Sequence, residues 1–138
     1  MTVDITDEYR PSEDEPYMNP RQREYFRRKL LRWREEILRG SGVTLRQLQE
    51  ETDRPADATD WASSEMQRYF ELRTRDRERK LLNKIDAALK RIEEGTYGYC
   101  EETNEPIGIR RLEARPIATL SIEAQERHER REKTHRSD

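Results

Sequence analysis

Few side chains in this 138-residue chain have the types and spacing that catalysis, metal binding or disulfide formation requires. Cys100 is the one cysteine, so no disulfide can form within the chain. His128 and His135 lie seven positions apart, whereas helical metal pairs lie roughly one turn apart, and we interpret both as surface histidines. The sequence has neither a glycine-rich phosphate loop nor a nucleophile setting for Ser, His and Asp. We therefore expect a protein that is not an enzyme.

The charge balance narrows the possible partners. Charged residues make up 42% of the chain and hydrophobic residues 31%, yet 28 basic and 30 acidic side chains leave a net charge of only −2. Coating of nucleic acid and polybasic attachment to a membrane both need a basic surplus. No apolar run has the length of a signal peptide or a membrane span. We expect a cytoplasmic protein without direct DNA binding and without membrane attachment.

So little apolar content suits either a disordered chain or long helices with one narrow apolar seam, and the Glu, Arg and Lys content favours the helices. Residues 1–16 carry six acids and two prolines and predict an acidic flexible tail. Asn19 and Pro20 predict the start of a helix as its cap and its first residue. A seam at heptad spacing follows, and Val43, Leu45 and Leu48 predict that the helix continues through Gly40-Ser41-Gly42. The seam residues are Phe26, Leu30, Trp33 and Ile37.

The segment 51–60, which contains Pro55, predicts a turn between two helices. The second helix is expected over 61–94, with Asp60 as its cap and Gly95 as its terminator. Residues 17–95 then form an antiparallel coiled coil with its tip at about 51–61. Its middle, RTRDRERK (73–80), has no apolar residue, which by itself suits a solvated face with ion pairs.

Glycine, asparagine and proline mark 96–116 as a loop-rich or hairpin unit, and 119–136 predicts a final helix. We expect this head, 96–138, to pack with the base of the coiled coil, 17–33 and 85–95. Cys100 is either a small buried side chain or a redox-sensitive thiol, which would need exposure and a lowered pKa. The predicted core places eight residues against Phe26, Leu30 and Ile92: Tyr97, Tyr99, Ile107, Ile109, Leu112, Ile117, Leu120 and Ile122.

Three segments closely resemble the DksA/TraR family: YMNPRQREYFRRKL (17–30), ELRTRDRERKLLNKI (71–85) and GYCEETNEPIGIRRLEARPIATL (98–120). The resemblance runs from about Tyr17 to about Glu126 and includes the spacing between the segments. It implies a mainly α protein in which a long antiparallel coiled coil projects from a small globular head with a C-terminal helix. It also implies a transcription regulator that binds bacterial RNA polymerase and inserts its coil into the secondary channel.

The resemblance assigns roles to residues of the coil. DATDWA (57–62) matches the family's tip motif, so Asp57, Asp60 and Ala62 are expected to act near the polymerase active centre. Taken alone, Asp57 is a turn residue and Asp60 a helix cap. Thr74 and Arg77 match the polymerase-contacting surface of the coil.

Family members also respond to guanosine tetraphosphate (ppGpp) in the stringent response, for example at ribosomal RNA promoters. The matching ligand positions are Leu81, Lys84 and Arg115, where basic groups suit a multiply phosphorylated ligand. Gln125 stands at a position where the family has a lysine, which implies a weaker response to the nucleotide.

Many family members carry a C-x2-C…C-x2-C zinc site in the head. Its four positions in this chain are Cys100, Thr103, Ser121 and Ala124. A single thiolate does not supply the binding energy of a four-ligand site, so we predict a zinc-free head and no cofactor.

Two other functions stay open. The heptad seam also permits a coiled-coil scaffold that dimerises, although we expect a monomer with an intramolecular hairpin. A transcript-cleavage factor of the Gre type uses a similar acidic-tipped coil, but nothing in this sequence resembles that group's separate β-rich domain.

Overall fold

The computed structural model is mainly α-helical and describes the backbone of residues 3–52 and 58–137, with the side chains of 3–40 and 63–134. Its helices in chain order are α1 (Pro20–Thr52), α2 (Ala58–Glu94), α3 (Ile109–Ala114) and α4 (Ile122–Ser137). The chain divides into two compact units, one of residues 1–30 with 87–138 and one of residues 31–86. The boundary between the two units therefore falls inside α1 and α2.

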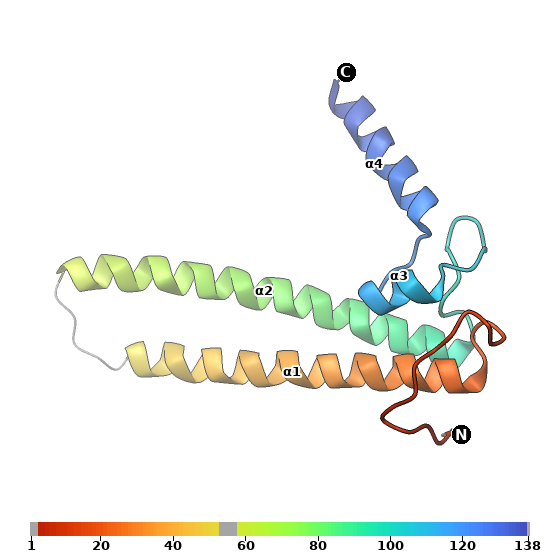
Figure 1. Cartoon of the computed structure of the whole chain (residues 1–138). Helices are drawn as coiled ribbons and strands as arrows, with labels where there is room; N and C mark the ends of the chain where they lie inside the picture. The colour runs from red at the N-terminus through yellow and green to blue at the C-terminus, as the bar shows by residue number, and fades with distance from the viewer. Residues whose placement is uncertain (1–2, 53–57, 138) are drawn as a thin grey trace. The chain divides into compact units, whose positions relative to one another are not determined.

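The unit of residues 31–86 is an antiparallel pair of helices, as predicted (Figure 1). Gly40-Ser41-Gly42 lies within α1, because the helix is continuous to Thr52. At the base of this unit Arg34 Nε lies 2.9 Å from Asp86 Oδ1 and joins the two helices. Four apolar side chains of α2 are exposed instead of forming a seam: Met66, Tyr69, Phe70 and Leu72.

Neighbouring residues explain where α1 begins and where α2 ends. The Asn19 side-chain oxygen accepts hydrogen bonds from the backbone N–H groups of Arg21 and Gln22, which confirms the predicted cap. Gly95 has a φ of 81°, and the N–H of Thr96 bonds to the carbonyl of Arg91 at 2.9 Å, so α2 ends where glycine allows a left-handed turn.

One predicted boundary is wrong, because α2 begins at Ala58 and not after Asp60. Asp60 is thus the third residue of the helix rather than its cap.

The unit of residues 1–30 and 87–138 has its own core. Phe26 and Leu30 from α1 and Ala88 and Ile92 from α2 are buried. From the later part of the chain the buried side chains are Tyr97, Cys100, Ile107, Ile109, Leu112, Ala118 and Ala124. Four predicted core residues are not buried: Ile122 is 50% exposed, Tyr99 is 36% exposed, and Ile117 and Leu120 are half-buried.

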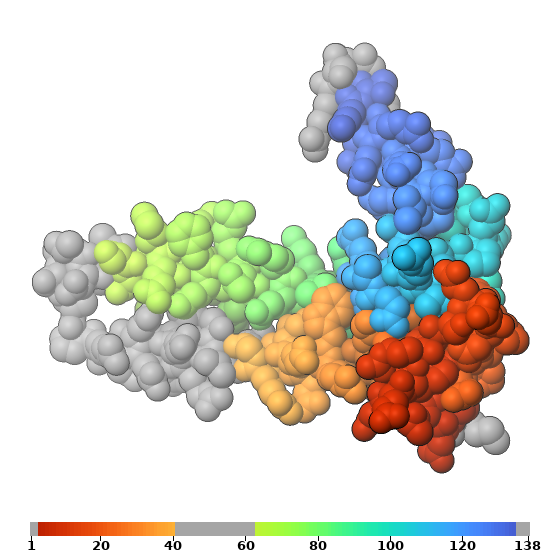
Figure 2. All heavy atoms as spheres, in the orientation of Figure 1, coloured from red at the N-terminus to blue at the C-terminus, as the bar shows by residue number. Residues whose placement is uncertain are grey.

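Residues 3–19 lie along the first turns of α1, where Figure 2 shows them as one continuous surface with that helix. The Arg28 side chain donates to the carbonyl of Ile5, and the Gln22 amide donates to the carbonyl of Ser12. The Tyr9 ring packs against Tyr25 and lies under the Arg21 guanidinium. This segment is therefore not the solvated arm that its acidic composition predicts, because its few aromatic and polar groups find partners on α1.

The segment after α2 forms a turn and a short helix. Tyr99 and Pro106 form an isolated antiparallel bridge, and Cys100 N–H bonds to the carbonyl of Glu105 at 2.8 Å. Helix α3 was not predicted, since 109–114 reads as part of a loop-rich segment. Helix α4 begins at Ile122, three residues later than predicted, because the Ser121 side chain accepts from Ala124 N–H and caps it.

Candidate polymerase-binding helix and degenerate zinc-finger site

The predicted contact residues of α2 share one face. Thr74, Arg77, Leu81 and Lys84 follow each other at spacings of three, four and three, which places their side chains above one another on a helix. Thr74, Arg77 and Lys84 are exposed, and Leu81 is half-buried. Within the described residues Arg77 and Lys84 form no ion pair, so this face presents unneutralised positive charge. Such a face can bind carboxylate or phosphate groups.

Asp57 lies outside the described residues. Asp60 and Ala62 lie in the first turns of α2, and their side chains lie outside the described part of the chain.

The third predicted nucleotide residue, Arg115, belongs to the other unit. It ends α3 with a φ of −143°, and its side chain is exposed. Gln125, at the family's lysine position, lies in the first turn of α4 and donates from its amide to Glu129 at 3.4 Å.

Hydrogen bonds connect the four degenerate zinc positions: Thr103 and Ser121 donate to the Cys100 sulfur, and Ser121 accepts from the N–H of Ala124. Its thiol is buried, with 1% of its surface exposed. Burial acts to raise the pKa of the Cys100 thiol, but hydrogen bonds from the Thr103 side chain and from the backbone N–H groups of Ser121, Thr103 and Glu102 outweigh it. They lower the pKa from 9.0 to about 6. The sulfur is thus held by donors from both Cys-x2-Cys halves of the motif.

The side chains present do not supply a tetrahedral zinc site. Ser121 uses its oxygen to cap α4, and Thr103 accepts from the N–H of Glu105 at 3.3 Å. Ala124 is fully buried and has no donor atom. Among the residues that the structure describes, no three His, Cys, Asp or Glu side chains gather in a way that could hold a metal ion. Cys100 is therefore the one zinc-ligand type in this cluster.

Tyr17 and His128, for which the sequence predicts no role in the head, support the Cys100 turn. The Tyr17 hydroxyl donates to the carbonyl of Gly98 at 2.6 Å and accepts from the N–H of Gly108 at 3.0 Å. It thereby joins the two ends of the turn that carries Cys100. Burial raises the pKa of Tyr17, so the hydroxyl keeps its proton for the Gly98 bond. On the other side, His128 of α4 pairs with Glu102 of the turn.

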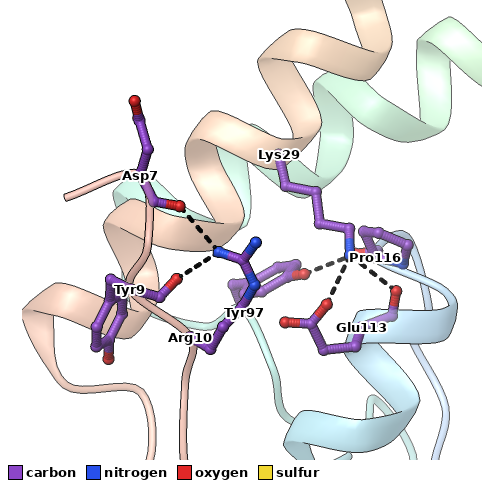
Figure 3. A network of polar contacts seen from close by, with 7 residues as sticks. All are labelled: Asp7, Tyr9, Arg10, Lys29, Tyr97, Glu113 and Pro116. Atoms are coloured by element: carbon purple, nitrogen blue, oxygen red, sulfur yellow. Dashed lines mark hydrogen bonds and ion pairs between the residues drawn. The ribbon is translucent and has the colours of Figure 1, made fainter. Parts of the chain in front are cut away.

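A second unpredicted contact joins α1 to the end of α3 (Figure 3). The Lys29 ammonium lies 2.7 Å from Glu113 Oε2 and 3.0 Å from the Glu113 carbonyl oxygen. Beside it, the buried Tyr97 hydroxyl donates to the carbonyl of Pro116 at 2.8 Å. No sequence signal marks these pairs, because their partners lie 84 and 19 positions apart.

None of the helices in the described part of the chain combines the length and the apolar character needed to cross a bilayer.

Known proteins resemble this chain over most of its length. Residues 22–92 match the family described as DnaK suppressor protein DksA, N-terminal domain, and residues 95–130 match the prokaryotic dksA/traR C4-type zinc finger. An RNA polymerase-binding transcription factor DksA of Caulobacter vibrioides is 68% identical over 131 residues, which are 95% of this chain and 92% of the relative. The protein of the same name from Escherichia coli K12 is 44% identical over 125 residues, covering 91% of this chain and 83% of the relative.

A solved structure agrees with the fold. Transcription factor DksA2 from Pseudomonas aeruginosa superimposes with a TM-score of 0.79 at 50% sequence identity, covering 85% of this chain and 90% of that one. The prediction of a mainly α, non-enzymatic protein is confirmed by these relatives. The chain belongs to the DksA family of transcription factors.

Proposed function

We propose that this protein binds bacterial RNA polymerase directly and regulates transcription initiation. The observation that carries the proposal is the exposed face of α2 with Thr74, Arg77, Leu81 and Lys84, in a chain whose relatives are named as RNA polymerase-binding factors. Arg77 contacts the polymerase through paired hydrogen bonds to carboxylates, and Thr74 lies one turn before it. The protein acts in the cytoplasm as a monomer, without binding DNA itself.

The tip of the hairpin enters the secondary channel in this proposal. Asp57 and Asp60 then bring negative charge close to the magnesium-centred active site, and Ala62 follows them on α2. A chain with a net charge of −2 and alternating signs along its helices enters such a channel without adhering to nucleic acid.

Guanosine tetraphosphate acts as the effector at the polymerase interface. Lys84 and Arg115 supply the cations, and Leu81 supplies apolar contact. Gln125 replaces a family lysine with a neutral amide, so the synergy with the nucleotide is weaker than in relatives that keep the lysine. In this proposal the protein and guanosine tetraphosphate together control ribosomal RNA promoters in the stringent response.

The head folds without zinc in this proposal. Support comes from the four residues at the zinc positions. Cys100 is a buried thiol, Thr103 and Ser121 carry hydroxyl groups, and Ala124 has no donor atom, so these positions offer one zinc ligand in place of four. Metal analysis of the purified chain should give far less than one zinc per molecule. One bound zinc per chain, retained after dialysis against a weak chelator, would refute a metal-free head.

Initiation at a ribosomal RNA promoter with purified polymerase tests the function. Asp57→Asn and Asp60→Asn should retain binding to polymerase and lose most of the effect on transcript yield, because they change charge without changing size. Glu93→Gln removes an exposed carboxylate near the other end of α2 and is the matched control.

The same assay separates the competing functions. Two tip variants that act like the parent would show that the tip assignment is wrong. Cleavage of the transcript in stalled polymerase would identify a transcript-cleavage factor, and a dimer in sedimentation without affinity for polymerase would identify a scaffold.

A further inference from the structure

The backbone around Arg115 is held at four points. The N–H of Arg115 bonds to the carbonyl of Arg111 at 2.7 Å, and the carbonyl of Arg115 accepts from Ala118 N–H at 3.0 Å. Just before it, the Glu113 carbonyl accepts from Lys29 at 3.0 Å, and just after it, the Pro116 carbonyl accepts from Tyr97 at 2.8 Å. These bonds fix the place from which the Arg115 side chain leaves the backbone.

The Arg115 side chain itself has no polar partner among the described residues. It is exposed, and among the residues that the structure describes it forms no hydrogen bond, ion pair or ring contact. A guanidinium that has no internal partner but a rigid backbone is prepared for an external anion, because less conformational freedom is lost when the anion binds.

Lys29 is the contact that connects this segment to a long helix. Its ammonium reaches across from α1 and binds both the side chain and the main chain of Glu113 in the last turn of α3 (Figure 3). A cation is favourable there, because the last carbonyl groups of a helix carry partial negative charge and lack helical partners. The pair is about two-thirds buried, with 34% of Lys29 and 33% of Glu113 exposed, so solvent competes with it only in part.

We propose that Lys29, acting through Glu113, is a positioning residue for Arg115. The inference rests on the proposed function, in which Arg115 binds guanosine tetraphosphate, and adds the residue that holds it in place. Lys29 does not itself contact the nucleotide, because its ammonium is engaged by two oxygens of Glu113. Without it, the segment loses one of the four bonds that hold its backbone, and Arg115 samples more orientations before the nucleotide binds.

The test compares Lys29→Met, which keeps the apolar stem and removes the charge, with Lys29→Arg, which keeps a donor. Arg34→Met is the matched control, since it breaks a similarly exposed ion pair between α1 and Asp86 in the other unit. Each full-length variant is titrated with guanosine tetraphosphate in the initiation assay. Lys29→Met should raise the half-maximal nucleotide concentration about threefold to tenfold and leave the effect without nucleotide unchanged. Lys29→Arg should restore the parent value, and Arg34→Met should not change it.

A direct measurement on the protein without polymerase accompanies the titration. The heteronuclear NOE of the Arg115 amide should fall in Lys29→Met, remain high in Arg34→Met and recover in Lys29→Arg. An unchanged NOE together with an unchanged half-maximal concentration in Lys29→Met would overturn the inference. Should Lys29→Met unfold, Glu113→Gln replaces it, because this variant weakens the pair and keeps the main-chain bond; an unchanged half-maximal concentration there overturns the inference equally.

Arg115→Ala distinguishes a failure of the positioning role of Lys29 from a failure of the proposed nucleotide site. If Arg115→Ala abolishes the nucleotide response and Lys29→Met does not alter it, then only the positioning role is wrong. If Arg115→Ala leaves the nucleotide response intact, then the nucleotide site of the proposed function is wrong, and the role of Lys29 falls with it.

Discussion

The hydroxyl of Tyr17 lies 2.6 Å from the carbonyl oxygen of Gly98, although the two residues are 81 positions apart. The same hydroxyl accepts the N–H of Gly108 at 3.0 Å. One side chain, just before α1, therefore closes the turn of residues 98–108 in which Cys100 lies. This bond and the hydrogen bonds to the Cys100 sulfur from Glu102, Thr103 and Ser121 connect the turn to the residues around it.

Tyr17→Phe should destabilise the protein by about 1–3 kcal/mol, because it removes two hydrogen bonds and leaves the N–H of Gly108 without a partner among the described residues, while the Gly98 carbonyl keeps its bond from Ile107. Urea denaturation followed by circular dichroism measures the change. Tyr99→Phe is the control: it removes the hydroxyl of an exposed neighbouring tyrosine, whose ring packs against that of Tyr17. Equal losses in the two variants would contradict the role given to the Tyr17 hydroxyl.

The Cys100 thiol should make stability depend on pH. Its folded-state pKa of about 6 lies below the ordinary value of 9.0, so the folded protein binds fewer protons than the unfolded chain between these values. The stabilisation should be complete above about pH 9, decrease as the pH falls, and be absent below about pH 6. Because serine does not titrate in this range, the stability difference between the parent and Cys100→Ser should grow from pH 6 to pH 9.

Thiolate absorbance in the ultraviolet gives an independent check on this prediction. The absorbance of the reduced parent should appear with a midpoint near pH 6 and be missing from Cys100→Ser. A midpoint near 9.0, with a constant stability difference, would show that the surrounding donors do not stabilise the thiolate.

Restoring three thiols should restore a metal site. Cys100 bonds to Thr103 and Ser121, and Ser121 bonds to Ala124, so a chain of hydrogen bonds connects the four positions. The triple variant Thr103→Cys, Ser121→Cys, Ala124→Cys should bind one Zn²⁺ per chain and raise the melting temperature when zinc is added. The single variant Thr103→Cys should not bind zinc stably. Failure of the triple variant to bind, while it remains folded, would mean that the turn has lost the geometry of the motif.

Two glycines should respond in opposite ways to alanine. Gly98 has a φ of 91°, and a Cβ there would lie 3.0 Å from Met18 Cγ, so Gly98→Ala should destabilise by more than about 1 kcal/mol. Gly40 lies within α1, and a Cβ added there would meet nothing within 4 Å, so Gly40→Ala should stabilise by roughly 0.5–1 kcal/mol. Thermal melts of both variants decide, and a destabilised Gly40→Ala would indicate that the helix needs this glycine.

The sequence by itself determined the two long helices of this protein, α1 and α2. Asn19 and Gly95 mark helix ends through interactions with their own neighbours, and the apolar seam predicts the continuity of α1 through Gly40. These signals are local, because capping and helical periodicity involve residues within about a turn of one another. The face of Thr74 to Lys84 follows from the same spacing, and the resemblance to a known family supplied its role.

Only the tertiary structure decided how the head is held together. Tyr17 and Lys29 find partners 81 and 84 positions away, and no local pattern distinguishes them from other surface residues. Helix α3 has six residues, too few to form alone, and depends on the burial of Ile109 and Leu112. The sequence likewise did not decide whether Cys100 is a buried side chain or a redox-sensitive thiol. Its burial and lowered pKa both arise from groups that the fold brings together, because a thiolate is stabilised by donors in space and not by its neighbours in the chain alone.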